Sequence, residues 1–235
     1  HLSILIEQMR RQDYEFAVSR PKVILKQDEQ GHTLEPIEEL TVDVPSEYVG
    51  SVMEKLGSRK AELVDMHTEN EGSTRLLFNI PARSLMGYRS ELLTDTRGNG
   101  VMSHVFHDYE PYKGAIEERK TGSLVAHETG DTSSYGLFNT QDRGRLFIGP
   151  GVPVYEGQIV GESARAGDIV VNVCKKKHVT NMRAAGSDEA LRLTPPVELT
   201  LEQCLEFIAD DELVEITPLS IRMRKRLLTK DARVK

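Results

Sequence analysis

Residues 34–111 alternate extended and helical patterns, and their order restricts the fold more than any other feature of the sequence. The segment 34–45 has the pattern of a strand ending in proline, and 46–58 has that of a helix with Ser46 as its N-cap. The order β-α-β-β-α-β is that of a split βαβ unit, so we expect a ferredoxin-like domain over residues 31–111. Its later elements are a hairpin at 60–69 and 73–81, a helix at 82–98 and a strand at 100–111.

The pattern changes after Pro111, where glycines and turn signals become denser. One main helix is expected at 199–212, capped by Thr200, and a closing hairpin at 213–228. We therefore expect residues 112–235 to form a β-rich domain with one main helix. Residues 1–30 carry a helical and then an extended pattern and predict part of a further domain, so the fold class is α+β. The short strand candidates of the β-rich domain are 145–148, 157–163 and 168–174.

The composition is that of a globular protein, with 38% hydrophobic and 29% charged residues in 235. No run approaches the roughly 20 apolar residues of a membrane-spanning helix, so no membrane partner is expected. Cys174 and Cys204 lie too far apart for a CxxC motif, and we interpret them as ordinary thiols of a reducing, cytoplasmic setting. The sequence opens on a helical pattern without an initiator Met, which leads us to expect a fragment of a longer protein.

No motif in the sequence predicts catalysis. His104 and His107 form an H-x-x-H pair, but residues three apart on a strand point to opposite faces, so they do not predict a metal site. The glycine-rich run 148–157 is not followed by the helix that a phosphate-binding loop requires. The sequence has no G-x-S-x-G, and neither cysteine carries a nucleophile motif. We expect no catalytic residue, metal or cofactor within this chain.

One short segment, CKKKHVTNMR at 174–183, concentrates positive charge in a chain of formal net charge −7. Adjacent lysines repel one another unless water or polyanions surround them, so the segment is either a solvated loop or a polyanion-binding one. Its size and charge density favour folded RNA over a small phosphate ligand. The candidate RNA-binding residues are Lys175, Lys176, Lys177 and Arg183 for phosphate, with His178, Thr180 and Asn181 for hydrogen bonding or stacking.

A second basic segment, 221–235, contains seven basic residues and one acid. On a strand, Arg222, Arg224 and Arg226 would share one face, opposite Lys225. Their partner could be RNA phosphate or the acidic stretch 202–215 of the same chain, and the sequence leaves both open.

Several motifs resemble one family of proteins. The stretch HLSILIEQMRRQDYEFAVSRPKV resembles the end of domain III in translational GTPases. LEPIEELTVDVPSEYVGSVMEKLGSRKAEL and IPARSLMGYRSELLTDTRGNGVMSHVFHDYEP resemble domain V of elongation factor G. The tip domain that separates these parts in elongation factor G is absent here. SSYGLFNTQDRGRLFIGPGVPVYEGQIVGE, KKKHVTNMRAAGSDEALRL and LVEITPLSIRMRKRLL resemble the C-terminal domain of the BipA/TypA proteins.

The resemblance implies the C-terminal region of a ribosome-associated GTPase of the bacterial cytoplasm, linked to large-subunit assembly and stress adaptation. It implies that the loop Lys175–Arg183 reaches large-subunit rRNA and A-site tRNA. The turn carrying Arg59 and Lys60 would lie near ribosomal RNA or would be an ordinary connection. GTP and Mg²⁺ would be bound by a GTPase domain that, with a β-barrel domain, precedes this region. We expect no GTP hydrolysis by this chain.

Two other functions remain open on the sequence alone. A stand-alone enzyme or binding protein for a phosphorylated small molecule could use the Lys175–Arg183 loop within a concave pocket. A protein-interaction module would instead present an exposed apolar patch.

Overall fold

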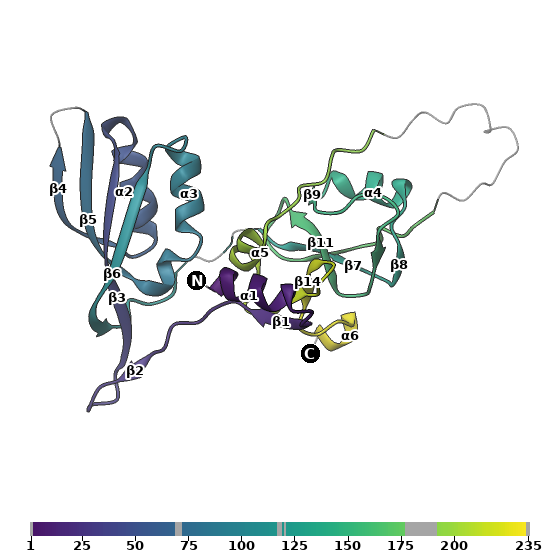
Figure 1. Cartoon of the computed structure of the whole chain (residues 1–235), viewed down its shortest axis with the longest axis horizontal. Helices are drawn as coiled ribbons and strands as arrows, with labels where there is room; N and C mark the ends of the chain where they lie inside the picture. The colour runs from purple at the N-terminus through teal and green to yellow at the C-terminus, as the bar shows by residue number, and fades with distance from the viewer. Residues whose placement is uncertain (1, 69–71, 117–118, 120, 177–191, 234–235) are drawn as a thin grey trace, which may run out of the picture. The chain divides into compact units, whose positions relative to one another are not determined.

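The computed structural model describes residues 2–68, 72–116, 119, 121–176 and 192–233. The chain divides into a central unit, Pro21–Glu118, and a terminal unit that combines His1–Arg20 with Arg119–Lys235 (Figure 1). Both units mix helices and strands, so the α+β class is confirmed. The predicted boundaries at residues 30 and 111, and the assignment of residues 1–30 to a separate domain, stay predictions.

The central unit is built on an antiparallel sheet in the order β2-β3-β5-β4, and β6 also pairs with β3. Along the chain, the main elements run β3-α2-β4-β5-α3-β6, which is the order the sequence predicts. The strands are β2 (Lys26–Gln27), β3 (Thr33–Pro45), β4 (Glu62–Thr68), β5 (Ser73–Pro81) and β6 (Val101–Pro111). The helices are α2 (Val49–Ser58) and α3 (Tyr88–Asp95), preceded by the 3-10 turns η1 (Ser46–Tyr48) and η2 (Ala82–Leu85).

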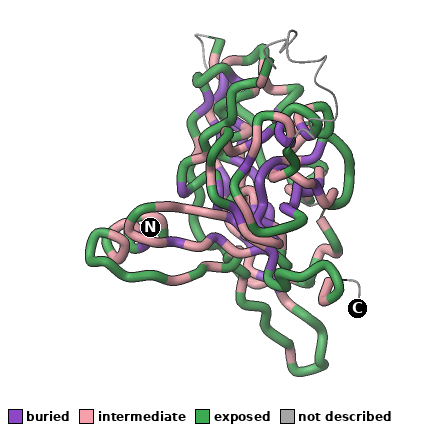
Figure 2. The backbone as a smooth tube through the Cα atoms, turned by 90° about the vertical axis from the view of Figure 1, so that its right-hand side faces the viewer, coloured by how far each residue is buried: buried purple, intermediate pink, exposed green. Residues whose placement is uncertain are grey.

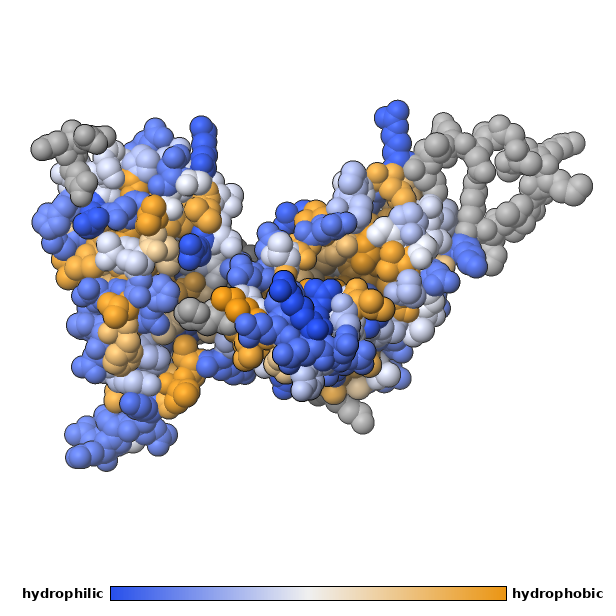
Figure 3. Space-filling view, viewed as in Figure 1, coloured by the Kyte–Doolittle hydropathy of each residue, from blue (hydrophilic) through white to orange (hydrophobic). Residues whose placement is uncertain are grey.

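Alternation along β3 explains why one face of this sheet is buried. Leu40, Val42 and Val44 all point into the core, as expected for period-2 side chains. They meet Val52 of α2 and Leu92 of α3 in one cluster. Strands β4 and β6 carry exposed apolar residues, among them Val64, Val101 and Val105, and hydrophobic patches reach the surface of this unit (Figure 3).

Ser46 does not act as the N-cap that the sequence predicts. Its hydroxyl donates to the carbonyl of Gly72 at 2.9 Å and lies 2.9 Å from the hydroxyl of Thr74, so the side chain ties the start of the helix to β5. The α-helix itself is capped at Tyr48, without a side-chain hydrogen bond. The helix predicted at 82–98 is also shorter, because Gly87 adopts a left-handed φ of 74° between η2 and α3.

The terminal unit contains a sheet in the order β1-β13-β14-β11-β7-β12, and β9 also pairs with β11. The pairs are antiparallel except for β12 with β7, which are parallel. Its strands are β1 (Phe16–Ser19), β7 (Ser123–Ala126), β9 (Gly144–Leu146), β11 (Gln158–Ser163), β12 (Ile169–Val171), β13 (Glu212–Ile216) and β14 (Ile221–Lys225). A separate ribbon pairs β8 (Gly130–Asp131) with β10 (Pro153–Val154).

Two hydrophobic clusters stabilise the terminal unit. One joins Ile6 of α1 (Leu2–Arg11) to Cys204 of α5 (Leu201–Phe207) and to Val214 of β13. The other joins Leu137 of α4 (Ser134–Gln141) to strands β7, β11 and β12. Figure 2 shows exposed residues along the projecting loops of the backbone and buried residues in its interior stretches.

The helices of the terminal unit differ from the sequence prediction. The helix at α4 occupies a stretch whose glycine and serines indicate turns, and the short α6 (Lys230–Arg233) was also not predicted. Helix α5 is shorter than the predicted 199–212, because Ile208 has extended backbone angles and Glu212 already begins β13. Its cap at Thr200 is confirmed, with a capping box completed by Gln203. Among the described residues, no helix is long and apolar enough to cross a membrane.

Candidate nucleic-acid interface

The basic loop predicted from the sequence begins shortly after β12 (Ile169–Val171), beyond Asn172 and Val173. Lys175 and Lys176 are both exposed and lie two and three positions beyond the buried Val173. The remaining predicted contacts of this loop, Lys177, His178, Thr180, Asn181 and Arg183, lie outside the described residues, and their placement stays a prediction.

Helix α4 fixes the chain on both sides of this loop. At its N-terminus, the Ser133 side chain donates to the carbonyl of Lys175, and the Ser133 backbone N–H donates to the carbonyl of Val173 at 2.9 Å. At its C-terminus, the Gln141 amide donates to the carbonyl of Arg192 at 3.1 Å. One short helix therefore anchors the chain at Lys175 and again at Arg192.

The anchor at the N-terminal end of α4 depends on close packing. Ser133 is the N-cap and accepts a hydrogen bond from the backbone of Gly136 at 2.9 Å. A Cβ atom at Gly136 would lie 2.3 Å from the carbonyl oxygen of Val173, so glycine is needed for the helix to approach this strand end. Burial, together with the charges of Glu128 and Asp131, raises the pKa of the neighbouring Cys174, which stays a thiol near neutral pH.

The second basic segment begins with β14, and some of its arginines contact acidic residues of the same chain. Arg222 and Arg224 contact Glu215 on the neighbouring strand, with nitrogen–oxygen distances of 3.4 and 3.7 Å. The phenol of Tyr155 donates to the same carboxylate at 2.8 Å. Arg226 is exposed and donates to the carbonyl of Asp210 at 3.2 Å. Of the two partners that the sequence leaves open, the acidic stretch is in contact with these arginines, and their binding to RNA stays a prediction.

Lys225 lies on the opposite face of β14, as strand alternation predicts, but sequence reasoning gave it no role. It is 2% exposed and contacts Asp211 and Glu212 at 3.0 and 2.9 Å, and also Asp168. Glu212 is fully buried and also accepts from the hydroxyl of Ser123 at 2.6 Å. Burial alone would lower the pKa of Lys225, but the carboxylates outweigh burial and raise it above its ordinary value.

In the central unit, Arg59 and Lys60 occupy the connection between α2 and β4. The guanidinium of Arg59 donates to the carbonyls of Ser84 and Met86, at 2.6 and 3.1 Å, and to Glu91 at 2.6 Å. Arg59 therefore has a structural role in holding η2. Lys60 is exposed and has a left-handed φ of 64°. Arg59 and Lys60 belong to the central unit and Lys175 to the terminal unit, and the contact of Arg59 and Lys60 with RNA stays a prediction.

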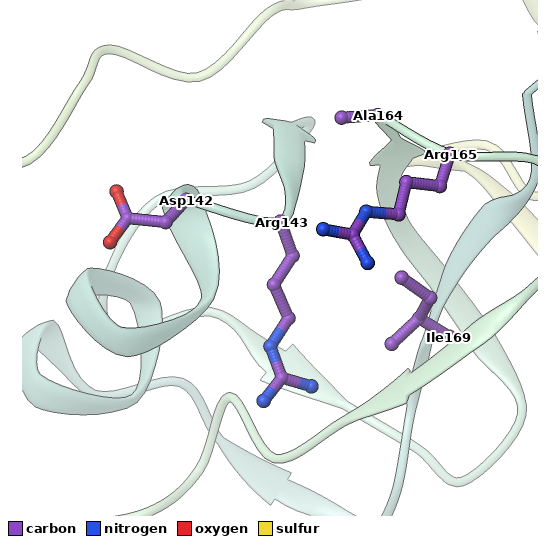
Figure 4. Close-up of a pocket in the computed structure, with 5 residues that line it drawn as sticks. All are labelled: Asp142, Arg143, Ala164, Arg165 and Ile169. Atoms are coloured by element: carbon purple, nitrogen blue, oxygen red, sulfur yellow. The ribbon is translucent and has the colours of Figure 1, made fainter.

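A hollow of about 350 Å³ lies in the terminal unit and was not predicted (Figure 4). Two arginines, Arg143 and Arg165, extend into it. No sequence motif singles them out, because they are 22 positions apart and each stands in a turn between strands or after a helix. Its lining residues are Asp142, Arg143, Ala164, Arg165 and Ile169.

Two family models match consecutive parts of the chain. The elongation factor G C-terminus matches residues 32–120, and the TypA/BipA C-terminal domain matches residues 121–230. The first match covers most of the central unit, and the second covers the strands β7 to β14 of the terminal unit.

Curated relatives match nearly the whole chain. The large ribosomal subunit assembly factor BipA of Escherichia coli K12 is 50% identical over 234 residues, which are 99% of this chain and 38% of that protein. The proteins of the same name from Haemophilus influenzae and Bacillus subtilis are 50% and 48% identical, over 99% and 100% of this chain and 38% of each relative.

The chain thus spans 38% of the length of these relatives. Among solved structures, a protein from Thermus thermophilus gives a TM-score of 0.33 at 28% identity, over 35% of this chain and 12% of its own, which is too weak a likeness to bear on the fold. Two adjoining family matches and relatives at about half identity agree: the chain belongs to the TypA/BipA family.

Proposed function

We propose that this chain is the ribosome-binding C-terminal region of a translational GTPase of the TypA/BipA type. The observation that carries the proposal is the 50% identity, over 99% of the chain, with a protein named large ribosomal subunit assembly factor. The chain would act in the cytoplasm by recognising RNA rather than by chemistry. A GTPase domain of the longer protein would bind GTP and Mg²⁺, and together with a β-barrel domain would be its partner within that protein. Ribosome assembly and stress adaptation are the processes served.

The RNA-binding element of this proposal is the loop Lys175–Arg183, directed at large-subunit rRNA and A-site tRNA. Its support is twofold. The exposed Lys175 and Lys176 stand where α4 anchors the chain, and the same helix holds Arg192 beyond the loop. Fixed attachment points of this kind reduce the conformational entropy that is lost on binding. Among the described residues, Lys175 and Lys176 do not line the hollow of the terminal unit, and a pocket for a phosphorylated small molecule stays the alternative.

The test is the triple variant Lys175→Ala, Lys176→Ala and Lys177→Ala, measured by co-sedimentation with purified large ribosomal subunits over a salt series. The slope of log affinity against log salt is negative, and each lost phosphate contact reduces its magnitude by roughly 0.7–0.9, so the loss of three contacts should reduce it by about 2 to 3. Replacing the same lysines by arginine keeps the charge and should keep the slope. An alanine variant with the affinity and slope of the unsubstituted chain would remove the loop from the proposal.

A further inference from the structure

The hollow in the terminal unit has two guanidinium groups directed into it. Arg143 follows the C-terminal end of α4, and Arg165 follows β11. Figure 4 shows both side chains extending into the space beside Ile169, while the carboxylate of Asp142 points away from it. Two positive groups from different parts of the chain thus share one concave surface.

Backbone hydrogen bonds hold the two arginines in this arrangement. The carbonyl of Arg143 accepts from the N–H of Ala164 at 2.8 Å. The carbonyl of Arg165 accepts from the N–H of Gly122 at 2.9 Å, and its own N–H donates to the hydroxyl of Ser163 at 3.1 Å. Both side chains therefore start from fixed backbone, which preorganises the pair for a ligand.

Two acids close to Arg165 in the sequence are engaged elsewhere. Glu162 contacts Arg145 and accepts from the hydroxyl of Thr121 at 2.7 Å. Asp168 accepts from the backbone of Ser123 at 2.8 Å and pairs with the buried Lys225.

Within the described part of the chain, neither Arg143 nor Arg165 has an ion pair or a side-chain hydrogen bond, and both are exposed. By contrast, Arg119, Arg145 and Arg222 of the same unit each contact a carboxylate. Asp142 also lines the hollow, but its carboxylate points away from the two guanidinium groups (Figure 4). The pair of like charges therefore has no carboxylate in contact with it among the described residues, which leaves it able to bind an anion.

We infer that Arg143 and Arg165 form a binding site for backbone phosphates of RNA. A guanidinium group presents a planar fork of donors that matches phosphate oxygens, and a pair of them can hold adjacent phosphates or one phosphate from two sides. The lining contains no aromatic side chain on which a base could stack, so the site reads the backbone rather than the sequence.

The position of the hollow favours RNA over other anions. Gln141, which holds the carbonyl of Arg192 at the far side of the basic loop, is two residues from Arg143. The site thus extends the surface on which the loop is anchored. This inference rests on the proposed function, since it adds a second phosphate contact to the same RNA-binding unit.

The experiment compares the double variant Arg143→Ala and Arg165→Ala with the unsubstituted chain. Binding is measured over a salt series to purified large ribosomal subunits and, separately, to protein-free large-subunit rRNA. Loss of two phosphate contacts should reduce the magnitude of the negative slope of log affinity against log salt by about 1.4 to 1.8. Because both side chains are exposed, thermal unfolding followed by circular dichroism should be unchanged.

Two control variants distinguish the loss of this particular site from a general loss of positive charge. Arg11→Ala with Arg89→Ala removes the same charge from exposed arginines elsewhere and should leave the slope unchanged. Arg143→Lys with Arg165→Lys keeps the charge and should keep the slope, with weaker binding because the fork geometry is lost. The inference is wrong if the Arg143→Ala, Arg165→Ala variant keeps the original slope on both RNA probes. It is also wrong if the Arg11→Ala, Arg89→Ala variant reduces the magnitude of the slope equally.

Further outcomes distinguish this site from its alternatives and from the proposed function. Saturable binding of inorganic phosphate that needs both arginines, with an unchanged RNA slope, would replace the RNA site with a small-anion site. Displacement by poly-glutamate as effective as by RNA would indicate an acidic protein partner instead. A chain that binds free rRNA through these arginines but does not bind large subunits supports the site and contradicts the proposed function. A chain that binds large subunits with an arginine-independent slope does the reverse, and one that binds neither RNA probe overturns both.

Discussion

In the described part of this protein, each buried charged side chain is stabilised by contacts with several partners. Glu212 is held by Lys225, by the hydroxyl of Ser123 and by the backbone N–H of Ala209 at 2.7 Å, and Arg119 approaches it at 3.3 Å. A buried carboxylate without such partners would be too costly to keep ionised. Removing one member of the group therefore costs more than removing a surface ion pair.

The contribution of Lys225 to stability can be measured through its dependence on pH. Its folded-state pKa is raised above the ordinary 10.5, so its contribution to stability is complete below that pH and is lost as the pH rises through the folded-state value. Lys225→Met should lower the free energy of unfolding at pH 8 by about 3–5 kcal/mol, and the gap from the unsubstituted chain should shrink above pH 10.5. Urea titrations followed by circular dichroism from about pH 8 to about pH 12 test this.

The comparison with the variant is needed because tyrosines also make stability depend on pH in this range, since phenols of the unfolded chain ionise at about pH 10. Burial raises the pKa of Tyr88 and, together with Glu215, that of Tyr155, and both effects cancel in the difference between the two proteins. Arg145→Ala breaks a more exposed pair with Glu162 and should cost no more than about 1 kcal/mol. A gap that stays constant to the end of the titration would show that Lys225 acts through packing alone.

Strand alternation predicted which residues of β14 share a face, but not what they contact. Met223 and Lys225 are buried, as residues two apart on a strand should be together. The partners of Lys225, however, come from β13 and from the turn before β12, and only the pairing of strands far apart in sequence brings them together. Arg143 and Arg165 were missed for the same reason, because only the folded chain brings these two residues into one hollow.

Among the elements, α4 shows where periodicity fails as a guide. Its eight residues include Gly136 and have few apolar positions, with Leu137 the one large apolar side chain that is fully buried. What keeps the helix in place is its cap at Ser133 and its approach to Val173, and a pattern of hydrophobic residues reveals neither. Helix α2, with Val52 and Leu56 on one face, was predicted because its burial follows the helical repeat.

Two glycines in helices give a matched test of this difference. Replacing a helical glycine by alanine ordinarily stabilises by about 0.5–1 kcal/mol, and a Cβ atom at Gly50 of α2 would meet nothing within 4 Å, so Gly50→Ala should follow that rule. Gly136→Ala should instead destabilise by about 1–3 kcal/mol, because its Cβ would meet the carbonyl of Val173. Urea unfolding of both variants, followed by circular dichroism, provides the measurement. Stabilisation by both substitutions would mean that α4 can move away from the strand end at no cost.

For the molecule as a whole, the central unit was the more predictable because its contacts lie within one continuous segment, residues 21–118. Strand β4 pairs with β5, its neighbour in sequence, while β3 pairs with β5 and β6 across the intervening elements. These pairings are those of the split βαβ unit, which the order of the elements indicates. The terminal unit is discontinuous. Phe16 of β1 pairs with Ile216 of β13, and β7 lies between β11 and the parallel β12. No local pattern specifies such partners.

This discontinuity leads to a test by dissection. Residues 21–118 expressed alone should fold and unfold cooperatively, since they contain their own core. Residues 119–235 alone should be less stable than the same segment in the intact chain, because they lose the edge strand β1 and the packing of Ile6, Phe16 and Val18 on α5 and β13. Burial of one large apolar side chain contributes about 1.5–3 kcal/mol, so the loss should reach at least about 3 kcal/mol. Adding a peptide of residues 1–20 should restore part of it, as urea unfolding would show. Equal unfolding midpoints with and without residues 1–20 would mean that the packing of the N-terminal helix and strand adds no stability to the terminal unit.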